Sequence, residues 1–355
     1  MGASNGFDRA VNEASAAVRS NRPEDALRLY RSALALRPIW AEGWWQVGRL
    51  LYDRNQCAEA RDALRQYVKL DPKPSRGWAL LGLSERRIGD DQAALQHLER
   101  ALTTNEKGAL ISRARCEAGK LLVRYQFYEA AQKILSAFAI QGEESPEIIE
   151  AMGFAALRLN KFPEESSPEI RQLATEAGRA VYDGLARRSS AATKEFKDLV
   201  KRHPDAPNVH YIFGDYLLDD HSDEALAEFL KELAVSHGHV PARVQIALEY
   251  LKRGEPGLGL PFAEEAVAIA PGFFAAHNAL GRILLDLGQM ERSIAELETA
   301  LKQAPQSPQS HFALATAYGR AGRKEDAARE RTEFLKLTKL LGRQDPPQPT
   351  NAPPR

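Results

Sequence analysis

The sequence predicts an all-α protein, a superhelical solenoid in which antiparallel helix hairpins stack one after another. The first observation is a small residue, Gly or Ala, that recurs along the chain at steps close to 34 residues. It occupies positions 14, 48, 82, 119, 153, 180, 214, 247, 281 and 315. Prolines repeat in the same rhythm, because Pro38 and Pro72 lie 34 residues apart, as do Pro271 and Pro305. A period of about 20 to 50 residues is typical of repeat proteins.

Composition and charge exclude several other classes of protein. The 355 residues include 48 Lys and Arg against 48 Asp and Glu, so the basic surplus of a general phosphate-backbone binder is missing. Hydrophobic residues make up 44% of the chain, yet no run reaches the roughly 18 apolar residues that span a bilayer. The two cysteines, Cys57 and Cys116, are too few for a disulfide framework or a structural zinc site. We therefore expect a folded protein with no membrane span and no nucleic-acid partner.

One period of the repeat has the pattern of two amphipathic helices. The first helix begins near Ala41 and places apolar residues at i, i+3, i+4 and i+7, which is one helical face. These residues are Trp44, Val47, Gly48 and Leu51. A polar turn over 53–56 leads to a second helix that ends at Pro72 and carries Ala60, Leu64 and Tyr67 on one face. A single hairpin cannot bury both faces, so neighbouring hairpins are expected to complete the core.

The order of these hairpins along the chain predicts two repeat blocks. The first block covers 7–162 and ends where the step between small residues shortens to 27, from Gly153 to Ala180. An irregular loop is expected over 163–167, because prolines at its borders interrupt a helix. The second block covers 168–341, and about nine or ten hairpins are expected in total. The segment 342–355 is rich in proline without apolar periodicity, which predicts a disordered tail.

These residues resemble the tetratricopeptide repeat (TPR) family over nearly the whole chain. The match is carried by sets of large, small and proline residues at family spacing: Trp44, Gly48, Ala60 and Pro72; Trp78, Gly82, Ala94 and Ala101; His277, Gly281, Ala300 and Pro305; His311, Ala315 and Ala327. The second half is similar to bacterial TPR proteins in Val209-His210-Tyr211 and in 321–327. The resemblance implies a helical solenoid that binds protein partners, with the first helix of each hairpin lining a concave groove.

The sequence shows no pattern that predicts catalysis, a cofactor or a metal. His210, His277 and His311 fall four residues before a small residue, the slot that Trp44 and Trp78 occupy, which predicts core or interface positions. His237 and His239 form an H-x-H without further ligands at matched spacing. The glycine-rich stretch 254–259 lacks the Lys and Ser or Thr of a phosphate loop. We therefore expect a non-catalytic protein.

The predicted groove of the first block carries a stripe of cations with aromatic neighbours. Steps of three and four residues place these side chains on one face of each first helix. The residues predicted to bind a partner are Trp45, Arg49, Tyr52, Arg76, Arg86, Arg87, Arg113, Lys120, Arg124 and Arg158. Two interpretations stay open: the stripe holds an acidic segment through forked Arg contacts, or it is a solvated face neutralised by Glu42, Glu85 and Glu117.

These patterns together predict a scaffold or adaptor that holds a protein or peptide partner, with an acidic segment as one candidate ligand. The alternatives are a helical-repeat nucleic-acid binder and a self-associating structural component. The low cysteine count fits a reducing compartment, which favours a cytoplasmic location. Export is the alternative, if a signal segment is absent from this sequence.

Overall fold

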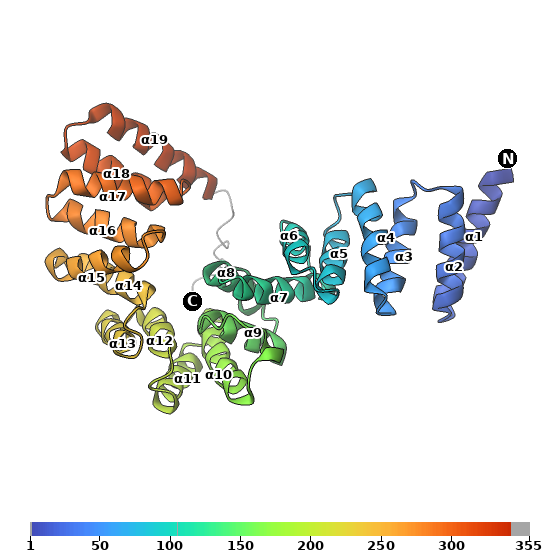
Figure 1. The fold of residues 1–355 in the computed structure, drawn as a ribbon, viewed down its shortest axis with the longest axis horizontal. Helices are drawn as coiled ribbons and strands as arrows, with labels where there is room; N and C mark the ends of the chain where they lie inside the picture. The colour runs from blue at the N-terminus through green and yellow to red at the C-terminus, as the bar shows by residue number, and fades with distance from the viewer. Residues whose placement is uncertain (1, 105, 342–355) are drawn as a thin grey trace, which may run out of the picture. The chain divides into compact units, whose positions relative to one another are not determined.

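The regular structure of this chain is helical throughout the part that is described. The computed structural model describes residues 2–104 and 106–341, and the segments 1, 105 and 342–355, including the predicted tail, lie outside it. Contacts divide the chain into two compact units, Met1–Leu199 (unit 1) and Val200–Arg355 (unit 2). Each unit consists of successive helix hairpins (Figure 1). The prediction of an all-α hairpin solenoid is confirmed.

Unit 1 contains hairpins made of a first helix that packs on the following second helix. They are α1 (Gly2–Arg19) with α2 (Pro23–Leu36), α3 (Ala41–Asp53) with α4 (Cys57–Leu70), α5 (Ser75–Arg87) with α6 (Asp91–Ala101), α7 (Ala109–Arg124) with α8 (Tyr128–Gln141), and α9 (Pro146–Ala156) with α10 (Pro168–Leu185). A short 3-10 helix, η1 (Pro163–Glu165), lies in the connection between α9 and α10. The helix α11 (Ser189–Arg202) follows and contains the boundary between the units.

Unit 2 repeats the same hairpin. Its pairs are α12 (Val209–Leu217) with α13 (Ser222–Val235), α14 (Val240–Lys252) with α15 (Pro256–Ile269), α16 (Phe274–Asp286) with α17 (Met290–Gln303), and α18 (Pro308–Arg320) with α19 (Lys324–Leu341). Three of the turns use Gly254, Gly288 and Gly322 at φ of 74°, 77° and 77°, a left-handed conformation that suits glycine after a helix. No helix in the described part of the chain is long and apolar enough to cross a membrane.

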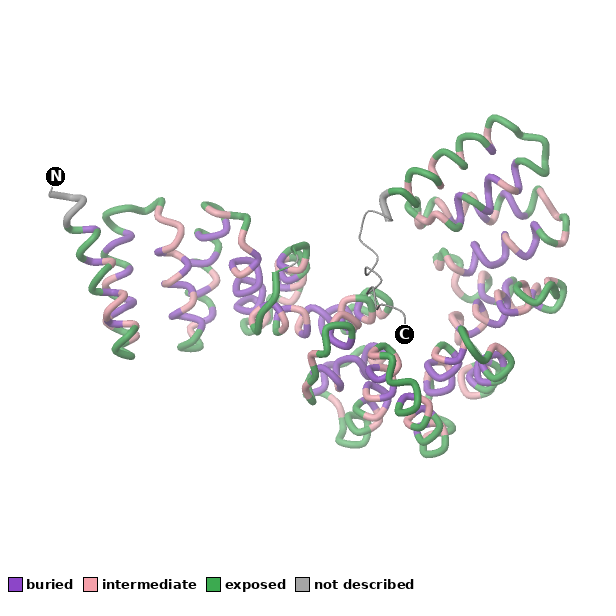
Figure 2. Tube along the Cα trace, turned by 180° about the vertical axis from the view of Figure 1, so that it is seen from behind, coloured by how far each residue is buried: buried purple, intermediate pink, exposed green. Residues whose placement is uncertain are grey.

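The small residues of the repeat lie where the two helices of a hairpin come closest. A Cβ atom on Gly48 would lie 2.6 Å from Leu64, and one on Gly281 would lie 2.6 Å from Leu297. Both contacts are shorter than side chains tolerate, so glycine is what permits this approach. Buried residues run along the facing sides of the helices in each unit (Figure 2). The predicted packing role of the small-residue series is therefore confirmed at these positions.

The hairpin of α9 and α10 departs from the regular repeat. Gly153 on α9 and Gly178 on α10 face each other's backbone, and a Cβ on either would overlap the carbonyl oxygen of Ala174 or of Ile149. The irregular connection over 157–167 therefore joins two helices of one hairpin. The predicted blocks, 7–162 and 168–341, follow the repeat register, whereas contacts separate the units at Leu199. The division into two blocks stays a prediction.

Candidate partner-binding surface

The side chains predicted to line a groove lie on the first helices of unit 1 or directly after one of them. The helix α3 carries Trp45, Arg49 and Tyr52, α5 carries Arg76, Arg86 and Arg87, α7 carries Arg113, Lys120 and Arg124, and Arg158 follows α9. These helices contact one another in succession, α3 with α5, α5 with α7 and α7 with α9. The ten side chains thus belong to one continuous layer, which we call the first-helix surface.

Guanidinium groups stack on aromatic rings along this surface. The pairs are Arg76 over Trp45 at 4.7 Å, Arg87 and Arg113 over Tyr52 at 4.0 and 5.8 Å, and Arg86 and Arg124 over Phe162 at 4.1 and 5.4 Å, measured to the ring centres. Stacking orders a long side chain and leaves the N–H donors at the edge of the guanidinium able to bind an anion. Phe162 was missed by the sequence pattern because it follows α9 in the irregular connection, outside the repeat.

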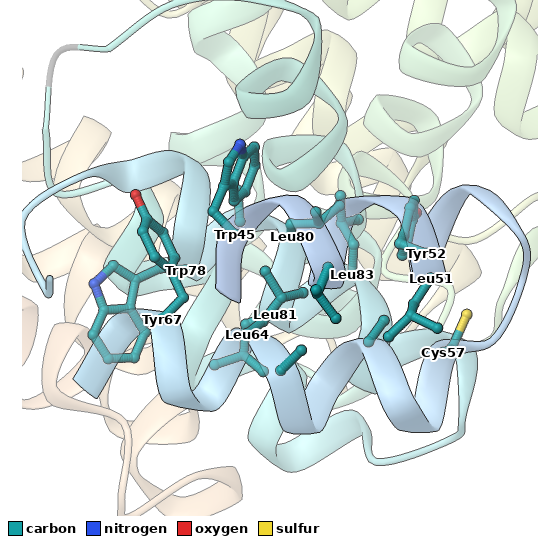
Figure 3. Packing of buried hydrophobic residues seen from close by; sticks show 14 of the residues in the cluster. Trp45, Leu51, Tyr52, Cys57, Leu64, Tyr67, Trp78, Leu80, Leu81 and Leu83 are labelled. Atoms are coloured by element: carbon teal, nitrogen blue, oxygen red, sulfur yellow. The ribbon is translucent and has the colours of Figure 1, made fainter. Parts of the chain in front are cut away.

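The two predicted aromatic residues belong to the core as well as to this surface. Trp45 and Tyr52 are only 8% and 6% exposed, and both lie in the hydrophobic cluster that α3, α4 and α5 share. Figure 3 shows them in that cluster together with Leu80 and Leu83 of α5. Each ring therefore contacts the stacked arginines on one side and the hydrophobic cluster on the other, and it offers little apolar area to a partner.

Carboxylates of the same chain neutralise most of the predicted cations. The ion pairs are Arg49 with Asp53 at 3.4 Å, Arg76 with Glu42 at 2.8 Å, Arg86 with Asp91 at 3.2 Å and Glu117 at 3.4 Å, Arg124 with Glu165 at 2.9 Å, and Arg158 with Glu129 at 2.6 Å. Of the carboxylates considered as internal partners, Glu42 and Glu117 pair in this way. Glu85 instead binds Arg65 and His97 on neighbouring second helices.

Lys120 is a buried structural cation. Its Nζ lies 2.8 Å from Glu117 and 2.5 Å from Glu147, so it ties α7 to the start of α9. Burial lowers the pKa of Lys120, but the ion pairs with Glu117 and Glu147 outweigh burial, and the pKa is raised overall. Burial also raises the pKa of the Cys116 thiol to about 12, so the thiol stays protonated and unreactive near neutral pH. Lys120 is therefore occupied by its own chain.

Arg87 and Arg113 differ from the other cations of the surface. Within the described residues neither guanidinium has a carboxylate within ion-pair distance. The polar contacts of Arg87 are with the Tyr52 carbonyl oxygen at 3.3 Å and the Cys57 sulfur at 3.9 Å. Both are exposed, and Tyr52 lies beneath them. The Tyr52 hydroxyl is buried without a hydrogen-bond partner, and burial raises its pKa. We call these three residues the Tyr52 cluster.

A depression of about 390 Å³ borders the Tyr52 cluster at Arg113. It lies between the first turns of α7 and α9 and includes Ser112, Glu143 and Glu147 in its lining. Both carboxylates already have partners, because Ser112 donates to Glu143 and Lys120 binds Glu147. The depression therefore leaves open space beside Arg113, whose charge is not neutralised by a carboxylate of the described residues.

Of the two histidines considered for metal binding, His239 has structural partners. His239 precedes α14, and its Nδ1 accepts the Ala242 N–H at 3.0 Å, while its Nε2 lies 2.9 Å from the Asn208 side-chain oxygen. The ring therefore caps the first turn of α14. Across residues 2–104 and 106–341, no group of three or more His, Cys, Asp and Glu side chains is arranged to hold a metal ion.

Family models support the repeat assignment in both units. Models described as "Tetratricopeptide repeat" match residues 11–52, 48–109 and 250–317. The first two matches cover α1 to α6, and the third covers the end of α14 to α18. The matched segments thus include most of the first-helix surface on α3 and α5.

Known proteins similar to this chain include human protein O-mannosyl-transferase TMTC3, which is 24% identical over 276 residues. That match covers 72% of this chain, but the chain spans only 29% of the length of TMTC3. Among solved structures, MamA 41-end from Desulfovibrio magneticus RS-1 is 22% identical with a TM-score of 0.42, over 48% of this chain and 97% of that one. A MamA RS-1 double mutant is 24% identical with a TM-score of 0.40, over 44% and 90%.

Proposed function

Because this chain belongs to the tetratricopeptide repeat proteins, we propose that it is a non-catalytic scaffold that holds a protein or peptide partner on the first-helix surface of unit 1. Repeats of this kind present a continuous layer of helices instead of an enclosed site, which suits an extended ligand. The ten predicted residues form the proposed surface. A cytoplasmic location is part of the same proposal, supported by the free, buried thiols of Cys57 and Cys116.

The observation that carries the proposal is the uncompensated charge of the Tyr52 cluster. Two exposed guanidinium groups without carboxylate partners attract an acidic segment, and a carboxylate can accept two parallel N–H bonds from each fork. Stacking on Tyr52 orders both arginines before the ligand arrives, which reduces the entropy lost on binding. The cations that already have carboxylate partners contribute to the shape of the surface, and ion pairs such as Arg76 with Glu42 fix the first helices relative to one another.

The double substitution Arg87→Gln with Arg113→Gln tests this assignment. We expect binding of acidic peptides to weaken by about 10- to 100-fold, because charge-assisted hydrogen bonds from both forks are lost. The measurement is fluorescence anisotropy with labelled Asp- and Glu-rich peptides, each compared with its Asn and Gln counterpart. Binding by the unmodified protein is expected to fall as salt concentration rises.

A matched control removes the same charge at sites that the chain neutralises itself. Arg31→Gln with Arg61→Gln changes two cations on second helices outside the first-helix surface, which are held by Glu59 and Asp62, and we expect less than a threefold change in affinity. Equal loss of binding in both double variants would show a diffuse charge effect and not a site. Tight, salt-sensitive binding of RNA by the unmodified protein would favour the nucleic-acid alternative instead.

A further inference from the structure

Three histidines of unit 2 occupy the same slot as two tryptophans of unit 1. The indole Nε1–H of Trp44 donates to the carbonyl of Pro38, and that of Trp78 donates to the carbonyl of Pro72, both at 2.8 Å. In the described part of unit 2, the Nε2 atoms of His210, His277 and His311 lie 2.9, 2.9 and 3.0 Å from the carbonyls of Pro204, Pro271 and Pro305. The equivalence predicted from the repeat is therefore confirmed.

The second ring nitrogen of each histidine binds a carboxylate on the second helix of the same hairpin. The Nδ1 of His210 lies 2.5 Å from Glu228, that of His277 lies 2.6 Å from Glu296, and that of His311 lies 2.7 Å from Glu330. Each ring thus joins the turn before the hairpin, the first helix and the second helix. We call each set of proline, histidine and glutamate a histidine joint.

The chemistry of the partners determines how many protons each joint holds. A backbone carbonyl only accepts hydrogen bonds, so Nε2 must carry a proton. An ionised carboxylate also only accepts, so the short contact at Nδ1 requires a second proton, on the ring or on the carboxyl group. Each joint therefore holds one proton more than a neutral histidine beside a free carboxylate. The rings are buried, with 7%, 6% and 8% exposed for His210, His277 and His311. Water therefore does not supply a hydrogen bond to Nδ1 in place of the carboxylate.

The charged groups around the joints support this arrangement. Lys231 also binds Glu228, at 2.6 Å, and Arg329 lies 3.4 Å from Glu330. The hydrogen bond from Glu228 raises the pKa of His210, and burial and Lys231 only partly oppose it. The pKa of Glu228 is lowered, since its bonds to His210 and Lys231 outweigh burial.

The remaining groups near His277 are already paired. On α15, which packs against α16, Glu264 and Glu265 are held by Arg292 and Arg243. Gln303 donates to the Pro271 carbonyl at 3.1 Å, beside the His277 ring, and brings no charge. Within the described residues of these helices, Glu296 is thus the charged group in contact with His277.

We propose that the histidine joints make the packing of their hairpins proton-dependent, so that these hairpins loosen as pH rises above neutrality while the hairpin of α3 and α4 does not. Loss of the proton at Nδ1 leaves a lone pair facing a carboxylate, and the bond between first and second helix becomes a repulsion. The hairpin of α3 and α4 keeps its packing because the indole N–H of Trp44, in the same slot, does not titrate. The hairpin of α5 and α6 is not a suitable reference, because His97 there binds the buried Glu85 at 2.6 Å.

The sign follows from the protons bound in each state. In the unfolded chain a histidine loses its proton near pH 6.5. In the folded chain the bond to Glu228 raises the pKa of His210, so between these values the folded state binds more protons than the unfolded state. The stability that this joint contributes is then fully present below about pH 6.5 and is lost as pH rises through the pKa of folded His210. The His210 joint shifts the folding equilibrium by at most about tenfold per pH unit in that window.

Hydrogen exchange of the full chain, read by mass spectrometry at pH 6 and pH 8 and corrected for the intrinsic exchange rate, tests the proposal. We expect the opening equilibrium of peptides from α12 and α13 to rise by about tenfold over this window, and that of peptides from α3 and α4 to stay constant. The decisive variant combines Glu228→Gln, Glu296→Gln and Glu330→Gln. A glutamine N–H can donate to the Nδ1 of a neutral ring, so we expect the pH dependence to disappear while the hairpins stay packed.

The control is Glu264→Gln with Glu265→Gln, which removes exposed carboxylates of the same unit that face no histidine; its pH dependence should match that of the unmodified protein. The same slope in the triple variant and in the unmodified protein would overturn the proposal. Nitrogen NMR of the histidines in the unmodified protein gives a result that does not depend on the variant folding. At pH 7 two protonated ring nitrogens are expected for His210, and a ring with a single N–H beside an ionised Glu228 carboxylate would exclude the mechanism.

Discussion

Replacement of Gly178 with alanine is expected to lower the free energy of unfolding of unit 1 by about 3 kcal/mol, although alanine normally stabilises a helix. The added Cβ would overlap the carbonyl oxygen of Ile149, which belongs to the backbone of α9 and cannot rotate away. The helices α9 and α10 would have to move apart and open space around Ala174. Urea unfolding followed by circular dichroism gives the change, and hydrogen exchange should locate it in α9 and α10.

Gly6→Ala serves as the matched control within unit 1. Gly6 lies in α1, and a Cβ there would lie 3.7 Å from Leu36, an ordinary contact. Alanine at this position is expected to be neutral or to stabilise by up to about 1 kcal/mol. If Gly178→Ala behaved like Gly6→Ala, the close approach of α9 and α10 would not hold in solution.

Glu232→Gln is expected to destabilise unit 2 by about 2 to 3 kcal/mol, the second large effect. Glu232 on α13 is fully buried, and its carboxylate accepts the backbone N–H of Asn208 at 2.9 Å and of Tyr211 at 3.2 Å. These donors lie at the start of α12, which has no side-chain cap of its own. An amide keeps one acceptor and points an N–H group at a second N–H donor, so one of the two bonds is lost.

Spectroscopy can assign this loss to unit 2. The four tryptophans of the chain are Trp40, Trp44, Trp45 and Trp78, so tryptophan fluorescence reports unfolding of unit 1 only. We expect Glu232→Gln to shift the circular dichroism transition without shifting the fluorescence transition. Glu224→Gln, on the exposed side of the same helix, should change neither by more than about 0.5 kcal/mol. A shift of the fluorescence transition would contradict the assignment.

The repeat pattern predicted the arrangement of hairpins because its information is local. The positions of Gly48 and Leu64 lie within one hairpin, and their spacing alone determines that a small residue faces a large one. The slot shared by Trp78 and His277 was recognised in the same way, since each residue lies four positions before a small residue of the series, Gly82 or Gly281. The predicted series of small residues was wrong at α10. It includes Ala180, whereas Gly178 is the residue of α10 whose added Cβ would overlap the backbone of α9.

The candidate surface was predictable in its residues but not in its charge balance. Arg76 and Arg87 look alike in sequence, one on each end of α5. Arg76 meets Glu42, which lies 34 residues away on the neighbouring first helix, whereas Arg87 meets no carboxylate within the described chain. Whether an arginine is neutralised depends on which turn of the next hairpin stacks beside it, and periodicity does not report that.

The sequence by itself determined the all-α class, the hairpin repeat and the places where helices approach, because these follow from the spacing of apolar and small residues along each helix. Only the tertiary structure decided which cations have no carboxylate partner among the described residues, which glycines make a close approach, and that His210, His277 and His311 each contact a glutamate. The physical reason is distance along the chain. Charges and hydrogen bonds are settled between residues about 20 to 40 positions apart, such as His277 and Glu296 or Lys120 and Glu147, that meet only when hairpins fold and stack.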